Sequence, residues 1–241
     1  MSKKKLLAMQ KQDEHILKNK MVLKDIKPMT KKQADLFEIY NRDIDGLSAI
    51  GSAGTGKNMC ALYLALKDVI EDNLYDKIII VRTAVQTRDQ GFLPGKLSEK
   101  MEQYETPYID IVNDLYDRSD AYKLLKDKGY IEFMSSSFVR GLTFNNAIII
   151  FDECQNANYQ EMRSVITRVG ENSRIIFCGD TKQDDLQASK NKNDKSGLAS
   201  FLNVLRNIDG GFPVVEFSKE DIVRSGLVKK FIIAEEEMCA Y

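Results

Sequence analysis

The 241-residue sequence predicts an α/β fold in which helices cover both faces of a mostly parallel sheet. Short apolar runs alternate along the chain with longer amphipathic stretches, which is typical of repeated strand–helix units. The apolar runs, such as KIIIV at 77–81 and AIIIF at 147–151, are continuous and rich in β-branched residues. Such runs indicate strands that are buried on both faces, as in parallel sheets.

Six strands and five helices are expected in alternation. The strands are predicted at 47–50, 77–81, 130–134, 147–151, 174–179 and 214–217. The helices are predicted at 30–40, 58–73, 96–116, 159–170 and from Gly197 onward. Thr30 is placed to cap the first helix with its side-chain oxygen. No internal repeat or domain break interrupts this pattern, so residues 29–241 are expected to form one domain.

Residues 1–28 differ from the rest, because they hold eight lysines and three acidic residues. We expect a basic arm or short helix, which either is solvated or contacts nucleic acid or a neighbouring subunit. The whole chain has a formal charge of -1, so any nucleic-acid contact depends on local clusters.

Composition excludes several classes of site. Four widely spaced cysteines argue against a zinc site or a disulfide framework, and a single histidine argues against a histidine-based metal site or a Ser-His-Asp triad. No apolar run reaches about 18 residues and the first residues do not resemble a secretory signal, so we expect a cytoplasmic protein without membrane contact.

The stretch GSAGTGKN follows the signature of a phosphate-binding loop through its first seven residues, which are Gly51, Ser52, Ala53, Gly54, Thr55, Gly56 and Lys57. Glycines let successive N–H groups converge on phosphate oxygens, and Lys57 is expected to reach the β- and γ-phosphates. Because a strand is expected before the loop and a helix after it, a nucleotide site is favoured over a chance turn.

The signature ends in Ser or Thr, whose hydroxyl binds Mg²⁺, but this chain has Asn58 at that position. The amide carbonyl is a hard oxygen ligand for Mg²⁺, although it sits farther from the backbone than a hydroxyl. Contacts from Lys57 and the loop amides do not need this side chain. We therefore expect ATP binding to persist and hydrolysis to be slowed.

Two acidic residues, Asp152 and Glu153, follow the buried strand at 147–151. Ligands bind α/β sheets at the carboxyl ends of the strands, where Asp152 would support Mg²⁺ and Glu153 would activate the attacking water. Gln183, after the strand at 174–179, is suited to contact a γ-phosphate or that water. Arg224 is expected to reach a phosphate on this or a neighbouring subunit. Taken alone, Gln183 is also typical of a polar loop, and Arg224 of a surface ion pair.

These blocks together resemble the PhoH-like ATPase domain. GSAGTGK, GFLPG, FVRGLTFNNAIIIFDECQN, GDTKQDDL, SGL and DIVRSGLV occur in the family's order, and the resemblance covers about residues 28–235. It implies a RecA-like fold related to superfamily 1 helicase cores. It also implies hydrolysis of ATP with Mg²⁺, action on RNA or single-stranded nucleic acid, and hexameric rings.

The resemblance also assigns individual roles. It implies that Gln33 reads adenine, that Gln183 senses the γ-phosphate and that Arg224 contacts nucleotide. Arg82 and Arg140 fall in blocks associated with nucleic-acid or subunit contacts.

The chain departs from the family at Asn58, where the family has Thr, and at Leu142, where RGLT replaces RGRT. The segment after VRTAV is also shortened. Some relatives carry a fused nuclease domain, which residues 1–28 are too short to contain.

Three functions fit these observations. The first is a Mg²⁺-dependent ATPase coupled to nucleic acid. The second is a nucleotide-binding regulatory or assembly protein with little turnover, as Asn58 suggests. The third is a small-molecule kinase, for which no acceptor pocket is evident in the sequence.

Overall fold

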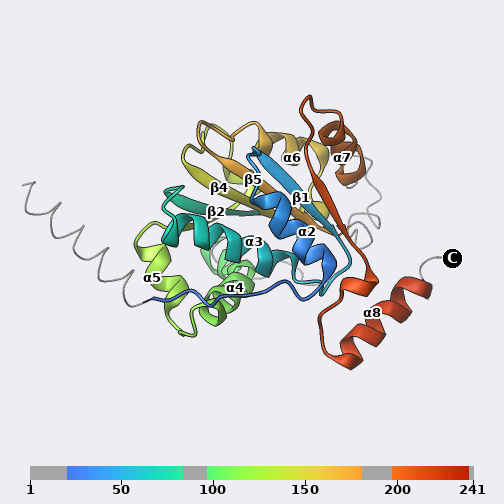
Figure 1. The fold of residues 1–241 in the computed structure, drawn as a ribbon. Helices are drawn as coiled ribbons and strands as arrows, with labels where there is room; N and C mark the ends of the chain where they lie inside the picture. The colour runs from blue at the N-terminus through green and yellow to red at the C-terminus, as the bar shows by residue number, and fades with distance from the viewer. Residues whose placement is uncertain (1–20, 84–96, 181–196, 239–241) are drawn as a thin grey trace, which may run out of the picture.

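The computed structural model describes residues 21–83, 97–180 and 197–238, and within them six strands form one sheet (Figure 1). They are β1 (Gly46–Gly51), β2 (Lys77–Arg82), β3 (Ile131–Ser135), β4 (Ala147–Asp152), β5 (Arg174–Gly179) and β6 (Val214–Phe217). Each strand matches a predicted strand to within one residue at either end. The predicted strands are therefore confirmed.

The sheet is parallel throughout and has the order β3-β2-β4-β5-β1-β6. β5 separates β1, which precedes the glycine-rich loop, from β4, which ends in Asp152. All six carboxyl ends lie at one edge, so the loop and the acidic residues are brought to the same side of the sheet.

Helices cover both faces, as predicted. α2 (Lys31–Tyr40), α3 (Lys57–Leu66), α4 (Leu97–Leu115) and α5 (Ala121–Asp127) pack on one face, and α6 (Tyr159–Ile166) and α7 (Leu198–Arg206) pack on the other. α3 continues as a π-helical turn, Lys67–Glu71. α8 (Gly226–Met238) lies at the margin of the molecule (Figure 1). The sequence reasoning missed α5 and α8.

Two apolar clusters flank the sheet, and neighbouring residues of one strand belong to different clusters. On β2, Ile78 and Ile80 pack towards α3 and α4, whereas Ile79 and Val81 pack towards α6 and α7. All four are fully buried. This is why the sequence of β2 is continuously apolar rather than alternating.

Residues 21–28 of the predicted arm are extended, and the rest of that arm lies outside the described residues. Met21 and Leu23 are buried in the core on the α3 side, and the Lys24 N–H donates to the Leu115 carbonyl across 2.9 Å. Thr30 then caps α2, since its side chain accepts from the Gln33 N–H, as predicted.

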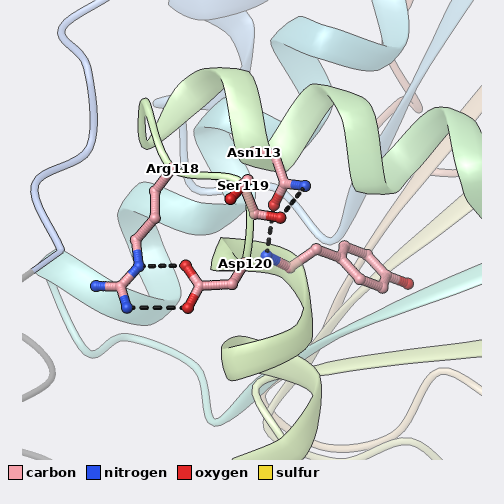
Figure 2. A network of polar contacts seen from close by, with 5 residues as sticks. Asn113, Arg118, Ser119 and Asp120 are labelled. Carbon is pink, nitrogen blue, oxygen red and sulfur yellow. Dashed lines mark hydrogen bonds and ion pairs between the residues drawn. The ribbon is translucent and has the colours of Figure 1, made fainter.

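The turn from α4 to α5 is held by a small polar network (Figure 2). Asn113 donates to the Ser119 carbonyl across 2.9 Å and accepts from the Tyr122 N–H across 3.0 Å, while Arg118 pairs with Asp120. α5 has no side-chain cap at Asp120, so Asn113 takes over part of that role.

Candidate functional site: a phosphate-binding loop beside two carboxylates

The loop between β1 and α3 is shaped by its glycines. Gly51 has φ +132°, and a Cβ there would lie 1.9 Å from the Phe217 carbonyl oxygen, so only glycine fits. α3 starts at Lys57 without a side-chain cap, which leaves its first N–H groups for the loop or a bound anion. A glycine-shaped loop and an uncapped helix start are features that phosphate-binding loops share.

Lys57, the first residue of α3, is 8% exposed. Its Nζ donates to the carbonyl oxygens of Gly51, at 2.5 Å, and Ser52, at 2.7 Å, and to the Thr55 hydroxyl. Burial lowers the pKa of the ammonium, and the carboxylates of Asp180, Asp152 and Glu153 act in the opposite direction. The ammonium is thus held by loop oxygens and interacts electrostatically with all three carboxylates.

Asp152 is 3% exposed and receives three hydrogen bonds. Asn58 Nδ2, at 2.8 Å, and the Tyr108 hydroxyl, at 2.6 Å, both donate to Oδ2, while the Glu153 N–H donates to Oδ1 across 2.8 Å. Burial raises the pKa of this carboxyl, and the three donors favour the ionised form. Asp152 is consequently fixed in orientation.

Glu153 has φ 51°, a left-handed conformation that is strained for a residue with a side chain. Gln155 Nε2 donates to Glu153 Oε2 across 2.5 Å, and Gln155 Oε1 accepts from the Asp180 N–H across 3.0 Å. Burial first, and the neighbouring Asp152 second, raise the pKa of the Glu153 carboxyl. A raised pKa makes this carboxylate a stronger base.

Arg82 pairs in register with Asp152 across β2 and β4, so it lies at the same edge. Its guanidinium stands 5.4 Å from the centre of the Tyr104 ring and donates to the Tyr104 carbonyl. The positive charge lowers the pKa values of Asp152 and Glu153 and opposes the effect of burial. Arg82 therefore lies at the same sheet edge as the two acids and favours their ionised forms.

Arg224 and Gln33 both flank the loop. A Cβ placed on Gly54 would lie 2.8 Å from Arg224 Cγ, and the Val223 N–H donates to the Gly54 carbonyl. Gln33 is 1% exposed, and its amide donates to the Thr55 carbonyl across 2.8 Å and accepts from the Met29 N–H across 2.8 Å. Arg224 is thus beside the loop of its own chain, and Gln33 anchors that loop.

The structure brings most of the predicted residues to one sheet edge. Gln183 lies outside the described residues, and Arg140 is exposed on the turn that follows β3. Two contacting residues were missed, Tyr108 and Gln155. Gln155 lies in the same short block as Glu153, but nothing local in the sequence of α4 pointed Tyr108 at an aspartate 44 positions away.

The donor set fits Mg²⁺, which proteins usually bind through one or two oxygen ligands together with substrate phosphates. Asn58 and Asp152 supply such oxygens beside the loop. Ser52, in the same loop, has a buried Oγ without a hydrogen-bond partner in the described part of the chain. Within the described ranges, no three His, Cys, Asp or Glu side chains are grouped so that they could hold a metal ion.

A glycine-rich loop between a parallel strand and a helix, facing an Asp-Glu pair at the end of a second strand, defines a P-loop NTPase domain. The family model described as "PhoH-like protein" matches residues 25–236. The chain belongs to the PhoH-like protein family.

Curated relatives show the same family. The chain is 36% identical over 226 residues to the PhoH-like protein of Bacillus subtilis, which is 93% of this chain and 68% of that protein. It is 34% identical to the PhoH-like protein of Mycobacterium leprae and 36% identical to Protein PhoH of Escherichia coli K12. These matches cover 89% and 77% of this chain, and 59% and 51% of the two relatives. The chain thus spans about half to two thirds of the length of these proteins.

Solved structures with a similar arrangement of strands and helices include the large terminase of a thermophilic bacteriophage in complex with ADP, with a TM-score of 0.46 and 13% identity. The match covers 85% of this chain and 49% of the terminase. The SWI2/SNF2 ATPase core of Sulfolobus solfataricus in complex with dsDNA matches with a TM-score of 0.41 and 14% identity, over 80% of this chain and 46% of that chain.

No helix in the described ranges has the length and apolar character that crossing a bilayer requires.

Proposed function

We propose that this domain binds ATP with Mg²⁺ and hydrolyses it slowly, in association with RNA or single-stranded DNA. The observation that supports this most is the meeting of Lys57, Asn58, Asp152 and Glu153 at one sheet edge, although they come from two segments about 95 residues apart. Phosphate-binding donors, oxygen ligands and a base are what phosphoryl transfer to water requires.

In this proposal each residue has one role. Lys57 and the loop N–H groups hold the phosphates. Gln33 recognises adenine, since its amide offers a donor and an acceptor, and each atom can make a second hydrogen bond beside those to Thr55 and Met29. Asn58 Oδ1 and Asp152 would hold Mg²⁺, which neutralises charge on the β- and γ-oxygens. Glu153 takes a proton from the attacking water. Gln183 is proposed to sense the γ-phosphate and Arg224 to stabilise its developing charge.

The test is phosphate release from Mg·ATP with and without single-stranded RNA or DNA. Glu153→Gln keeps the shape of the side chain and removes the base, and general-base catalysis contributes roughly 100-fold or more. We expect this variant to bind ATP normally and to lose at least that factor in turnover. Unchanged turnover would refute the mechanism.

A second function is favoured by one contact. Asn58 donates from Nδ2 to Asp152 at the position where the P-loop signature has a Ser or Thr hydroxyl. The alternative is therefore a domain that binds ATP with little hydrolysis. It would act as a nucleotide-dependent regulatory or assembly protein. Asn58→Thr restores the usual hydroxyl. A strong gain of turnover in this variant, from a wild type that binds ATP without releasing phosphate, would establish the second function.

Ring assembly is part of the proposal, and α8 supports it. Leu227 and Phe231 are 80% and 64% exposed and lie one turn apart, while Ile232 approaches the loop glycine Gly54. A subunit contact on this helix would place a neighbour next to the nucleotide site. Sedimentation should show a higher-order oligomer that Phe231→Asp dissociates; a monomeric wild type would exclude the ring.

A further inference from the structure

Next to the residues proposed to hold Mg²⁺ lies a residue to which the sequence pattern assigned no role. Tyr108, on α4, is 1% exposed and directs its hydroxyl at Asp152 Oδ2, which it reaches at 2.6 Å. Asn58 Nδ2 lies 2.8 Å from the same oxygen. One buried carboxylate oxygen therefore accepts from two side chains that come from different helices.

Packing fixes the tyrosine in place. Its ring contacts Phe133 of β3, with 5.6 Å between ring centres. One turn earlier on the same helix, the Tyr104 ring contacts the guanidinium of Arg82, the residue that pairs in register with Asp152. α4 thus contacts the middle of β3 and the ends of β2 and β4, and the tyrosine hydroxyl has little freedom to leave the carboxylate.

The amide of Asn58 is planar, so a hydrogen bond that fixes its nitrogen also fixes its oxygen. A carboxylate can only accept hydrogen bonds, which requires the Asn58 NH₂ to face Asp152 and Oδ1 to point away from it. No protein group in the described ranges donates to Oδ1. A Ser or Thr hydroxyl at this position would likewise donate to one oxygen and accept with the other lone pairs.

We propose that Tyr108 is a positioning residue for Mg²⁺: its hydroxyl fixes Asp152, Asp152 fixes the Asn58 amide, and the amide carbonyl is thereby directed to the metal. The proposal rests on the proposed function, because it concerns the same nucleotide site. Asp152 then orients the Asn58 amide in addition to its own proposed part in holding Mg²⁺. Hydrogen-bonded partners of metal ligands typically change metal affinity about 10- to 100-fold when they are removed.

The experiment is a Mg²⁺ titration of a fluorescent, non-hydrolysable ATP analogue bound to wild type and Tyr108→Phe, beside the same binding measured in EDTA. Tyr108→Phe keeps the ring and its packing. We expect the Mg²⁺ concentration at half-effect to rise about tenfold while nucleotide affinity in EDTA is unchanged. An unchanged midpoint, or an equal loss of affinity in EDTA, would overturn the proposal.

The chain offers a matched control. The Tyr122 hydroxyl donates to Glu105 Oε1 across 2.6 Å, so Tyr122→Phe also removes a buried tyrosine–carboxylate hydrogen bond, between α5 and α4. It should lower the unfolding midpoint to a similar extent and leave the Mg²⁺ midpoint at the wild-type value. An equal Mg²⁺ shift in this control would reduce the role of Tyr108 to general stability and overturn the proposal.

A double-mutant cycle tests the route through Asn58. If Tyr108 acts by orienting that amide, Tyr108→Phe should shift the Mg²⁺ midpoint far less in an Asn58→Ala background. Fully additive shifts would exclude this route. The wild-type measurement distinguishes failure of the proposed function from failure of this inference. If wild-type nucleotide binding did not depend on Mg²⁺, the proposed function itself would be wrong. If binding depended on Mg²⁺ but Tyr108→Phe left that dependence unaltered, only this inference would be wrong.

Discussion

Gln155 Nε2 lies 2.5 Å from Glu153 Oε2, and the other end of the same amide accepts from the Asp180 N–H. The side chain is 3% exposed and joins the acidic end of β4 to the exit of β5. Glu153 itself sits in a strained left-handed conformation. The Glu153 carboxylate is therefore held in place by a hydrogen bond from Gln155.

Gln155→Met preserves length and removes both hydrogen bonds. Since a misplaced catalytic group can cost about 100-fold, we expect kcat for ATP to fall by up to that factor, with nucleotide affinity unchanged. Steady-state phosphate release and equilibrium binding measure the two quantities. Equal losses in binding and turnover would show that Gln155 supports the loop rather than Glu153.

Gln33→Ala removes the amide that lies against Thr55 and is proposed to read adenine. We expect affinity for ATP to fall more than affinity for GTP, because only the adenine contact depends on the base. Competition binding with both nucleotides measures the ratio, and discrimination against one base by a good amide contact is worth about 1–3 kcal/mol. An equal fall for both nucleotides would leave Gln33 as a loop anchor alone.

Phe138 is 53% exposed on the turn after β3, and Arg140 follows it there. An exposed aromatic ring two residues from an exposed cation suits a stacked base and its phosphate. We expect Phe138→Ala to weaken binding of single-stranded RNA or DNA by about 1–3 kcal/mol, and Arg140→Ala to reduce the salt slope by about one.

Fluorescence anisotropy at several salt concentrations measures both effects. Arg42→Ala is the matched control, since Arg42 is an exposed cation near the opposite sheet edge, where it pairs with Glu38. If Arg42→Ala weakened binding as much as Arg140→Ala, nucleic acid would be bound by general charge and not by the turn after β3.

Arg174 joins the start of β5 to the end of α2. It donates to the carbonyl oxygens of Tyr40, Arg42 and Ile44, lies 4.6 Å from the Tyr40 ring centre and is 3.9 Å from Asp68. Lysine cannot reproduce this planar set of donors. We expect Arg174→Lys to lower the free energy of unfolding by about 1–3 kcal/mol in urea denaturation, without changing nucleotide affinity. A shift below about 0.5 kcal/mol would contradict this role.

Cys60 is buried in α3, and burial raises the pKa of its thiol from 9.0 to about 12. Between these values the unfolded chain loses the thiol proton while the folded chain keeps it, so stability falls as pH rises from 9 towards 12. The limiting slope is about 1.4 kcal/mol per pH unit for one thiol. We expect urea denaturation from pH 8 to 10.5 to give a shallower decline in Cys60→Ala; identical slopes would contradict the assignment.

Much of the fold was predictable because its signals are local. Short, mostly apolar runs marked all six strands, and Thr30 marked the start of α2. α5 and α8 were missed for different reasons: α5 is a short helix whose start is fixed by Asn113 of another helix, and α8 exposes apolar residues instead of burying a clear stripe.

The sequence by itself determined the phosphate-binding loop, the Asp-Glu pair and the expectation that parallel strands carry them to one edge, because glycine patterns and strand ends are written in consecutive residues. Only the tertiary structure decided what contacts those residues. Asn58 and Tyr108 share one oxygen of Asp152, and Gln155 spans two strand ends. Both arrangements arise only when side chains from separate helices and strands converge after folding. Such contacts depend on the packing of distant elements, and no local pattern of residues records them.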